Sequence, residues 1–450
     1  MKPRRVSEDK KSDATGAPPA SPARAVVVVP YVKRRLAEGP RSIEARLDEA
    51  VGLARAIDLD VAHSGIVPVT TIRPATLLGK GKVEEIAGLV RVEGAGLVFV
   101  DHALTPVQQR NLEKEWNAKV LDRTGLILEI FGERARTREG ALQVELAHLN
   151  YQRSRLVRSW THLERQRGGF GFLGGPGETQ IEADRRMIRA RMGKLRRELE
   201  QVRKTRGLHR ERRGRAPWPV IALVGYTNAG KSTLFNRMTG AGVIAEDMLF
   251  ATLDPAMRAV RLPGLDKAIL SDTVGFISDL PTQLVAAFRA TLEEVTAADL
   301  IVHVRDMANP DNAMQKRQVL EVLGDLGVTG SKAEEEGRIP ILEAWNKLDL
   351  LDAPHRDELK AAAGKSPGIV LLSAQTGEGV SLLEERIASL LTKAHRRYRL
   401  DLPVGDGAGA AWLHQHGEVI DHWVEGDRAW YEVRMAPGDL ERFQAQPERT

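Results

Sequence analysis

The sequence predicts a multidomain α/β protein, and three observations lead to that fold class. The 450-residue chain is too long for one hydrophobic core, so we expect two to four domains. Short apolar runs alternate with amphipathic helical patterns over residues 26–122 and again over 220–394, as expected for helices that cover mainly parallel sheets. Between these parts lie two long helical stretches, each with a narrow apolar seam, which predict an antiparallel helical hairpin.

The composition narrows the class of protein. Hydrophobic residues make up 42% of the chain and charged residues 28%, close to globular averages, and the chain has no long apolar run, so we expect no membrane span. The absence of cysteine excludes disulfides, iron–sulfur clusters and cysteine zinc sites, and the first residues lack the apolar core of a signal peptide. We expect a cytoplasmic protein that acts as a monomer.

The amino-terminal part divides into a tail and a domain. Residues 1–25 are polar, rich in proline and without periodicity, which predicts a disordered tail. Residues 26–140 are expected to form a small α/β amino-terminal domain with a mainly parallel sheet. Its expected strands span 26–29, 67–72, 97–100 and 119–122, and its expected helices span 42–57, a stretch after "LLGKGK", and 106–117.

Residues 141–215 are expected to form the hairpin, because apolar positions recur there with alternating spacings of four and three. The first seam comprises Leu142, Leu146, Leu149, Arg153, Leu156, Trp160 and Leu163, and the second comprises Ile181, Arg185, Ile188, Met192, Leu195, Leu199 and Val202. The connection "GGFGFLGGPG", residues 168–177, predicts a glycine-rich tip that exposes Phe170, Phe172 and Leu173. A plain turn between two helices is the alternative interpretation of this tip.

Positive charge is concentrated in the hairpin. Residues 151–215 contain 19 Lys and Arg against 7 Asp and Glu, whereas the whole chain has a net charge of only +5. Such an excess is typical of a surface that contacts nucleic acid, because cations that neutralise phosphates release counterions. A solvated helix that uses arginine as a good helix former is the alternative interpretation.

The tip also has the GxGxxG spacing of a dinucleotide-binding turn, in Gly169, Gly171 and Gly174. A dinucleotide-binding oxidoreductase is therefore an alternative function. It would need a strand before the loop and an acidic residue at a strand end about twenty residues later. The preceding "RSWTHLERQR" is charged and helical instead, which disfavours this function.

A second domain follows the linker "RAPWPV". Residues 218–394 are expected to form an α/β domain with a doubly wound sheet, with strands at 220–225 and in the runs that begin at 268, 299, 339 and 368. In residues 400–450, two runs of alternating apolar and polar residues on either side of a Glu-Gly-Asp turn predict a β-hairpin. We expect this hairpin to belong to a small α+β carboxy-terminal domain.

The strongest functional motif is "GYTNAGKS", which follows an apolar strand and precedes a helical pattern. It fits the GxxxxGK[ST] phosphate-binding loop, in which Lys231 reaches the terminal phosphates and the Ser232 hydroxyl binds Mg²⁺. The expected nucleotide-binding residues of this loop are Gly225, Tyr226, Thr227, Asn228, Ala229, Gly230, Lys231, Ser232 and Thr233.

Three further motifs indicate a guanine nucleotide. In "DTVG", Asp272, Thr273, Val274 and Gly275, the aspartate can hold the Mg²⁺ shell and the Gly275 amide can contact the γ-phosphate. In "NKLD", which contributes Asn346, Lys347 and Asp349, the Asp349 carboxylate can accept two hydrogen bonds that guanine donates and adenine lacks. In "SAQTG", with Ser373, Ala374 and Gln375, the Ala374 amide can donate to the guanine oxygen. With the phosphate-binding loop, these motifs predict that residues 218–394 are a P-loop GTPase domain.

Three positions bear on hydrolysis. Phe276 stands where familiar GTPases place a catalytic glutamine, so we expect slow intrinsic hydrolysis that depends on a partner. Thr252 is the candidate switch threonine that closes on Mg²⁺ and the γ-phosphate, although an ordinary loop threonine is the alternative. The expected catalytic residues are Lys231, Thr252 and Gly275. The expected metal ligands are Ser232, Thr252 and Asp272. Asn228 stands where some GTPases bind K⁺, although asparagine also suits a tight loop.

Several long motifs together resemble the HflX family of GTPases over residues 26–394. They are "LLGKGKVEEI", "DHALTPVQQRNLE", "VLDRTGLILEIFGERARTREGALQVELA", "GGFGFLGGPGETQIE" and the GTPase motifs. The resemblance implies binding to the large ribosomal subunit and its RNA, and a GTP- and GDP-dependent role in dissociating ribosomes or rescuing stalled ones under stress. It also implies that the tip probes an RNA-lined cavity near the peptidyl-transferase centre. A GTPase of ribosome assembly or rRNA maturation is the alternative function.

Overall fold

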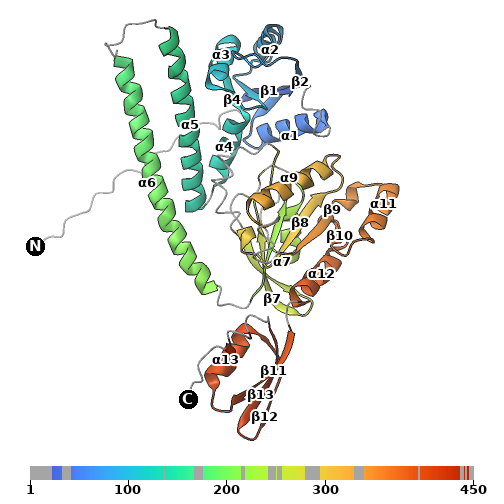
Figure 1. Ribbon diagram of the computed structural model, residues 1–450. Helices are drawn as coiled ribbons and strands as arrows, with labels where there is room; N and C mark the ends of the chain where they lie inside the picture. The colour runs from blue at the N-terminus through green and yellow to red at the C-terminus, as the bar shows by residue number, and fades with distance from the viewer. Residues whose placement is uncertain are drawn as a thin grey trace, which may run out of the picture.

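The computed structural model describes residues 23–32, 42–135, 137–166, 176–213, 218–241, 250, 256–278, 294–328, 339–393, 396–435, 440 and 443–444. Four parts follow one another along the chain (Figure 1). They are a small α/β domain, a long helical hairpin, a second α/β domain and a small α+β domain, so the predicted fold class is confirmed. Most of the tail predicted at residues 1–25 lies outside the described residues. Within the described part of the chain, none of the helices is long and apolar enough to cross a membrane.

The amino-terminal domain has a four-stranded sheet of order β2-β1-β3-β4 in which all neighbouring strands are parallel. The strands are β1 (Arg24–Val32), β2 (Asp60–Val69), β3 (Leu97–Val100) and β4 (Lys119–Asp122). The helices are α1 (Ile43–Arg55), α2 (Lys80–Glu93), α3 (Pro106–Trp116) and α4 (Arg123–Arg134). The second strand begins at Asp60 rather than at the expected residue 67. Its more polar first half is only partly buried, so the sequence shows no apolar run there.

Local sequence explains where these helices begin. The Ser42 hydroxyl accepts a hydrogen bond from the Ala45 amide at the start of α1. Thr105 and Gln108 form a reciprocal capping box ahead of α3, whose first residue is Pro106. Such caps satisfy amides that the helix itself leaves without partners, so the chain enters each helix at a defined residue.

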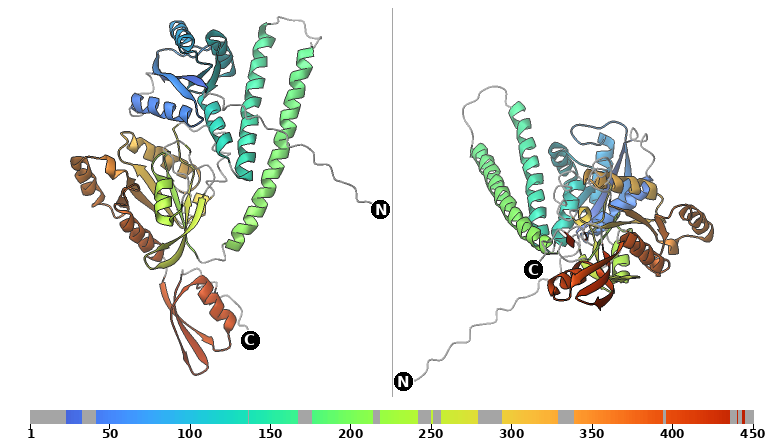
Figure 2. Two further views of the ribbon diagram at one scale, coloured as in Figure 1. Left: turned by 180° about the vertical axis from the view of Figure 1, so that it is seen from behind. Right: turned by 60° about the horizontal axis from the view of Figure 1, so that its bottom comes forward.

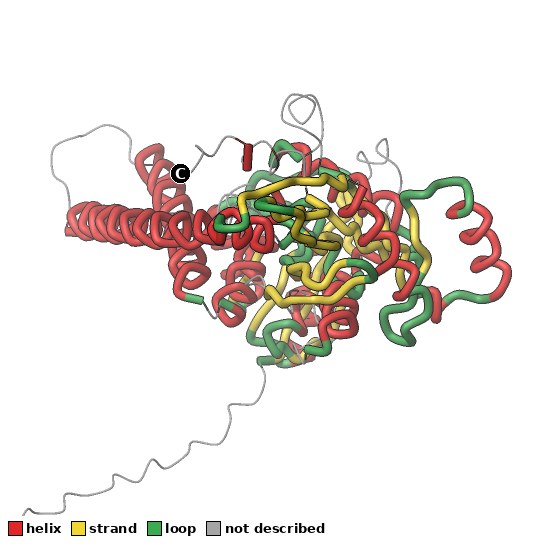
Figure 3. The backbone as a smooth tube through the Cα atoms, turned by 90° about the horizontal axis from the view of Figure 1, so that it is seen from below, coloured by secondary structure: helices red, strands yellow, loops and turns green. Residues whose placement is uncertain are grey.

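The hairpin consists of α5 (Arg138–Gln166) and α6 (Pro176–Arg213), which lie side by side and to one side of the sheets (Figures 2 and 3). Helix α5 lies against α3 and α4 of the amino-terminal domain. Its seam is formed by Leu142, Leu195 and Leu199, with Leu146, Leu149 and Val202 packed against them. The predicted apolar seam is therefore present at the base, and Met192 of the second seam is also buried. The side chains of Leu156, Trp160, Leu163 and Ile181 and residues 167–175 of the tip lie outside the description. Because helix α5 precedes the tip, the strand that a dinucleotide-binding turn needs is replaced by a helix, and that alternative is wrong.

The second α/β domain has a six-stranded sheet of order β10-β9-β8-β5-β7-β6. The strands are β5 (Val220–Gly225), β6 (Ala256–Leu262), β7 (Leu265–Asp272), β8 (Leu300–Asp306), β9 (Ile341–Asn346) and β10 (Ile369–Leu371). The helices are α7 (Lys231–Thr239), α9 (Asn312–Asp325), η2 (Leu348–Leu350), α11 (Ala353–Ala363) and α12 (Val380–Lys393). Only β6, which the sequence did not predict, runs antiparallel to its neighbour.

The carboxy-terminal domain is a three-stranded antiparallel sheet of order β11-β13-β12 with one helix packed on it. Its elements are β11 (Arg396–Pro403), α13 (Gly407–His416), β12 (Glu418–Glu425) and β13 (Arg428–Met435). The predicted β12–β13 hairpin is present. Strand β11 begins at Arg396, slightly before the expected start of this domain at residue 400.

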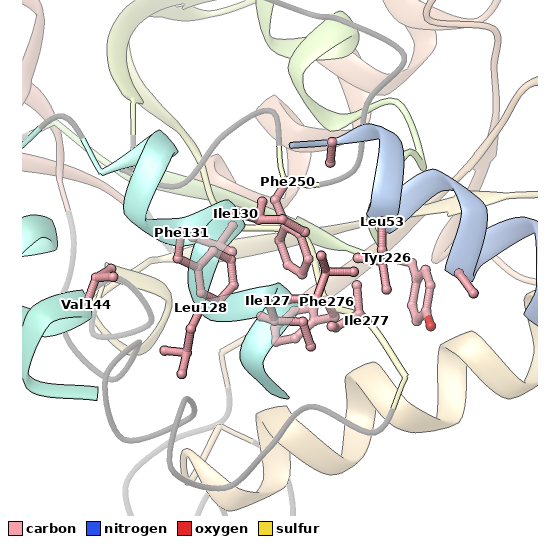
Figure 4. Packing of buried hydrophobic residues seen from close by; sticks show 14 of the residues in the cluster. Leu53, Ile127, Leu128, Ile130, Phe131, Val144, Tyr226, Phe250, Phe276 and Ile277 are labelled. Atoms are coloured by element: carbon pink, nitrogen blue, oxygen red, sulfur yellow. The ribbon is translucent and has the colours of Figure 1, made fainter. Parts of the chain in front are cut away.

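The two α/β domains share a continuous hydrophobic cluster (Figure 4). Ile127 and Phe131 on α4 belong to this cluster together with Phe250 and Phe276 of the second domain. The rings of Phe131 and Phe250 meet edge to face, with centroids 4.7 Å apart. This shared core fixes the amino-terminal domain against the loops that carry the nucleotide motifs.

Candidate functional site

The predicted motifs meet at the carboxyl edge of the six-stranded sheet. Gly225 ends β5, Asp272 ends β7 and Asn346 ends β9. Strand β5 is flanked by β7 on one side and β8 on the other, so the chain order reverses there. Open α/β sheets bind ligands at this kind of topological switch point.

The phosphate-binding loop occupies the turn between β5 and α7. Asn228 is exposed and has a φ of +59°, which agrees with its use in a tight loop; the K⁺ site beside it stays a prediction. Gly230 has a φ of +91°, and a Cβ added there would stand 2.2 Å from Nδ2 of Asn346. Glycine is therefore required at this position both for its backbone angle and for the close approach of the Asn346 side chain. Helix α7 begins at Lys231, so its first amides face the loop, as suits a phosphate.

Lys231 points back into the loop. Its Nζ donates hydrogen bonds to the carbonyl of Gly225 at 3.2 Å and to that of Tyr226 at 2.9 Å. Burial lowers the pKa of the Lys231 ammonium to about 8, and the nearby Asp272 carboxylate opposes this shift only in part. A phosphate beside Nζ would restore the usual preference for the charged form.

Ser232 and Asp272 provide two oxygens at one point of the site. The Ser232 hydroxyl donates to Oδ2 of Asp272 at 2.7 Å, and Asp272 is fully buried. A hydroxyl and a carboxylate are the hard oxygen ligands that Mg²⁺ takes alongside water and phosphate, so this pair fits the ion. Thr252, the third expected metal ligand, lies outside the described residues.

The "DTVG" segment lies directly on the phosphate-binding loop. The Phe276 amide donates to the Gly225 carbonyl at 3.1 Å, and the Thr227 amide donates to the Phe276 carbonyl at 2.7 Å. The Thr273 hydroxyl donates to the Leu223 carbonyl at 2.6 Å, and Val274 is buried. These bonds extend the pairing of β5 with β7 past the end of both strands.

The side chain of Phe276 is buried in the shared hydrophobic cluster near Ile127 and Ile277 (Figure 4). Phe276, which stands where familiar GTPases have a catalytic glutamine, therefore stabilises the contact between the two α/β domains in this conformation. A phenyl ring offers no hydrogen bond to an attacking water, which agrees with the expectation of slow intrinsic hydrolysis.

The predicted base-binding residues come together on the other side of the loop. Asn346 donates through Nδ2 to the Ala229 carbonyl and accepts the Ala374 amide at Oδ1, both at 2.8 Å. It thereby ties the phosphate-binding loop to the "SAQTG" loop. The Ser373 hydroxyl donates to Oδ1 of Asp349 at 2.6 Å, which fixes how that carboxylate is turned. Lys347 has a φ of +67°, and its Nζ pairs with Asp306 at 2.9 Å.

One supporting residue was missed by the sequence analysis. Arg237 on α7 donates to the carbonyls of Ala374 and Gln375 at 2.6 and 2.5 Å. It therefore holds the base-side loop from the helix that follows the phosphate-binding loop. An arginine in an amphipathic helix has no distinguishing local pattern, so only the folded structure identifies this contact.

Comparison with known proteins gives matches along most of the chain. Residues 44–132 match the family described as "GTP-binding GTPase N-terminal", 134–213 match "GTP-binding GTPase Middle Region", and 220–346 match "50S ribosome-binding GTPase". The chain is 51% identical to the GTPase HflX of Magnetococcus marinus over 403 residues, 90% of this chain and 91% of that protein. It is 45% identical to the GTPase HflX of Escherichia coli (strain K12) over 371 residues, 82% of this chain and 85% of that protein.

Proposed function

Because this chain belongs to the HflX family of GTPases, we propose that it binds the large ribosomal subunit and couples its GTP cycle to dissociation or rescue of stalled ribosomes. Binding and hydrolysis of GTP follow from the family itself. The ribosomal partner is supported by the description "50S ribosome-binding GTPase" of the proteins that residues 220–346 match.

The charged hairpin is the observation that carries this proposal. Helix α6 has 38 residues, so it is about 57 Å long. Its buried seam includes Leu195 and Leu199, whereas Arg186, Arg189 and Arg197 are exposed. A long rod with arginines along its outer surface suits the phosphates of a large RNA, which a small-molecule substrate would not require.

We propose that the residues of the site divide among the phosphates, the base and the metal ion. Lys231, Thr252 and Gly275 act on the γ-phosphate, and Asp349 with Ala374 selects guanine. Ser232, Asp272 and Thr252 would hold Mg²⁺, which would neutralise the charge of the phosphates. The remaining contacts come from the loop residues Tyr226, Thr227, Asn228, Ala229 and Thr233 and from Thr273, Val274, Asn346, Lys347, Ser373 and Gln375.

The partner supplies what the chain lacks at Phe276. Because the phenyl ring does not position water, hydrolysis is triggered when the large subunit places a further group, or reorders residues 272–278, beside the γ-phosphate. Hydrolysis then permits release. Purified large subunits are therefore expected to raise the hydrolysis rate well above that of the protein alone, and equal rates would contradict this assignment.

Sedimentation with separated subunits and intact ribosomes tests the function. With a non-hydrolysable GTP analogue we expect the protein to travel with the large subunit and the population of intact ribosomes to fall, whereas GDP should give neither effect. Tighter binding to immature than to mature large subunits would favour the assembly function instead. Absence of the protein from every ribosomal fraction would refute both.

Two variants separate the hairpin from the GTPase site. Reversing the charges of Arg186, Arg189 and Arg197 should weaken ribosome binding and its salt dependence while GTP binding stays intact. Deleting residues 168–177 should also spare GTP binding but impair dissociation, because we propose that this tip enters an RNA-lined cavity. Full dissociation by the deletion variant would leave the tip a plain connection.

A further inference from the structure

A buried polar cluster joins the amino-terminal domain to the GTPase site. Arg123, the first residue of α4, is buried and donates to the carboxylates of Asp101 and Glu49, the latter at 2.5 Å. The same guanidinium donates to the backbone carbonyl of Ser278 at 2.8 Å, 155 residues away. Asp101 follows β3 and Arg123 follows β4, so the cluster lies at the carboxyl edge of the amino-terminal sheet. Open α/β sheets bind ligands at this edge, and here the bound group is the main chain of the neighbouring domain.

The phosphate-binding loop takes part in the same cluster. The Tyr226 hydroxyl donates to Oε2 of Glu49 at 2.9 Å and is hydrogen-bonded to the Ser278 hydroxyl. Glu49 thus accepts from Arg123 and from Tyr226 with its two oxygens. Charge holds the cluster together: burial disfavours the Asp101 carboxylate, but Arg123 and Arg46 more than compensate and keep its pKa below the usual value.

Ser278 ends the described part of the segment that carries "DTVG", and we call residues 272–278 the switch segment. Its Phe276 is hydrogen-bonded to the phosphate-binding loop, as described above. Gly275 lies so close to that loop that an added Cβ would stand 2.7 Å from Cγ2 of Thr227 and 3.0 Å from Nζ of Lys231. A terminal phosphate that bonds to Lys231 needs the space next to this Nζ. Because the γ-phosphate must fit between Nζ of Lys231 and the Gly275 amide, we infer that GTP requires these two groups to lie further apart than GDP, which lacks this phosphate.

The residue before Arg123 holds the hairpin. Asp122 is buried and accepts the Tyr151 hydroxyl at 2.7 Å through Oδ1 and Nη2 of Arg155 at 2.6 Å through Oδ2. Both donors lie on α5. Asp122 also caps α4 by accepting the Gly125 amide at 2.8 Å. Two consecutive residues, Asp122 and Arg123, therefore connect helix α5 of the hairpin to the switch segment.

We propose that Arg123 is a positioning residue of the GTPase reaction, which holds the switch segment on the phosphate-binding loop through the Ser278 carbonyl. Asp122 sets the place of Arg123 relative to α5, so a displacement of the hairpin loosens this hold and favours GTP over GDP. The proposal rests on the nucleotide site at residues 225–232 but not on the ribosome as partner. It assigns a role to the "VLDRTG" motif, which the GTPase chemistry alone leaves unexplained.

The Arg123→Lys variant of the full chain tests the hold on the switch segment. Lysine keeps a positive charge between Asp101 and Glu49, but its single ammonium cannot also serve the Ser278 carbonyl as the guanidinium fork does. We expect the affinity for a non-hydrolysable GTP analogue to rise about tenfold relative to that for GDP, the effect of one hydrogen bond from a charged donor. Fluorescence titration with each nucleotide measures this ratio.

Arg46→Lys is the matched control. Arg46 donates to Oδ2 and to the carbonyl of the same Asp101, at 3.1 and 3.0 Å, and both bonds stay within the amino-terminal domain. We expect its ratio of affinities to stay that of the wild-type chain. An unchanged ratio in folded Arg123→Lys, or an equal shift in Arg46→Lys, would overturn the proposal. If circular dichroism shows that Arg123→Lys does not fold, Tyr226→Phe takes its place, because it removes the hydrogen bonds of the Tyr226 hydroxyl to Glu49 and to the Ser278 hydroxyl. An unchanged ratio there would overturn the proposal equally.

A double-mutant cycle tests the link to the hairpin. Arg155→Gln removes a bond to Asp122, and we expect it to shift the ratio about threefold in the wild-type chain and not at all when Arg123 is already lysine. Additive shifts would refute the link through Asp122. These outcomes differ from a failure of the nucleotide assignment. In that case the wild-type chain would bind neither GTP nor GDP, and the proposed role of Arg123 would be refuted together with the nucleotide site.

Discussion

Replacing Asp349 by asparagine should change the preferred base from guanine to xanthine. The structure places the carboxylate with Oδ1 on the Ser373 hydroxyl at 2.6 Å and leaves Oδ2 for the base. Guanine then loses two hydrogen bonds to a charged acceptor, each worth about 2 kcal/mol. The expected loss of GTP affinity is about 4 kcal/mol, or roughly a thousandfold.

Ser373 also determines how the new amide is turned. Its hydroxyl donates, so the amide oxygen of the Asp349→Asn variant stays on Ser373 and the amide nitrogen faces the base, where xanthine offers an oxygen in place of the amine. Competition between labelled GTP and unlabelled xanthosine triphosphate measures the exchange of preference. The matched control is Asp352→Asn, which removes the same charge at an exposed helix cap where asparagine serves as well as aspartate. Equal GTP affinity in both variants would refute Asp349 as the residue that reads the base.

Three further predictions follow from the phosphate side of the site. Gly230→Ala should weaken nucleotide binding at least a hundredfold, because its Cβ would meet Asn346 at a φ of +91°; Gly240→Ala, also at positive φ but in open space, should bind normally in the same titration. GTP affinity should fall as the pH rises through about 8, because the bound phosphates favour the charged form of Lys231, whose pKa in the free protein is lowered to about 8. Calorimetry at about pH 8.5, in buffers of different ionisation enthalpy, should detect proton uptake on binding, and its absence would contradict the lowered pKa of Lys231. The side chain at position 276 enters the shared hydrophobic cluster and not the nucleotide site, so we expect Phe276→Gln to leave intrinsic hydrolysis no faster and to lower the free energy of unfolding by about 3 kcal/mol in a denaturant titration. Faster hydrolysis at unchanged stability would show that the ring is not needed in the core.

The elements that the sequence predicted correctly are those whose signal is local. Strand β5 is a run of apolar residues whose alternate side chains enter the cores on the two faces of the sheet, with Leu223 on one face and Val224 on the other. The phosphate-binding loop that follows it consists of neighbours in the chain. Asn346 and Ala374 are far apart in sequence, but Asn346 ends β9 and Ala374 lies just after β10, and parallel strands bring such positions to one edge.

The features that the sequence analysis missed depend on tertiary context. Strand β6 includes the exposed Arg258 between Met257 and Ala259, so its apolar signal is weak, and it forms through pairing with β7 at the edge of the sheet. Helix α4 is buried on most sides, from Leu126 to Phe131, and a short run in which only Glu129 is polar has too little periodicity to distinguish helix from strand. The contact of Arg123 with Ser278 links two domains and has no local signal in either segment.

The shared core makes motion near the nucleotide costly. Phe250 and Phe276 lie on either side of β6 and β7 in sequence, and both rings pack against the amino-terminal domain in one cluster (Figure 4). Moving Gly275 away from Lys231 shifts the neighbouring Phe276, whose burial contributes about 2 to 3 kcal/mol. A γ-phosphate alone must offset this burial and the hydrogen bonds of the Arg123 cluster. A partner that draws α5 away from Asp122 would remove part of that cost, so the GTP-bound conformation should become favoured where the hairpin is engaged.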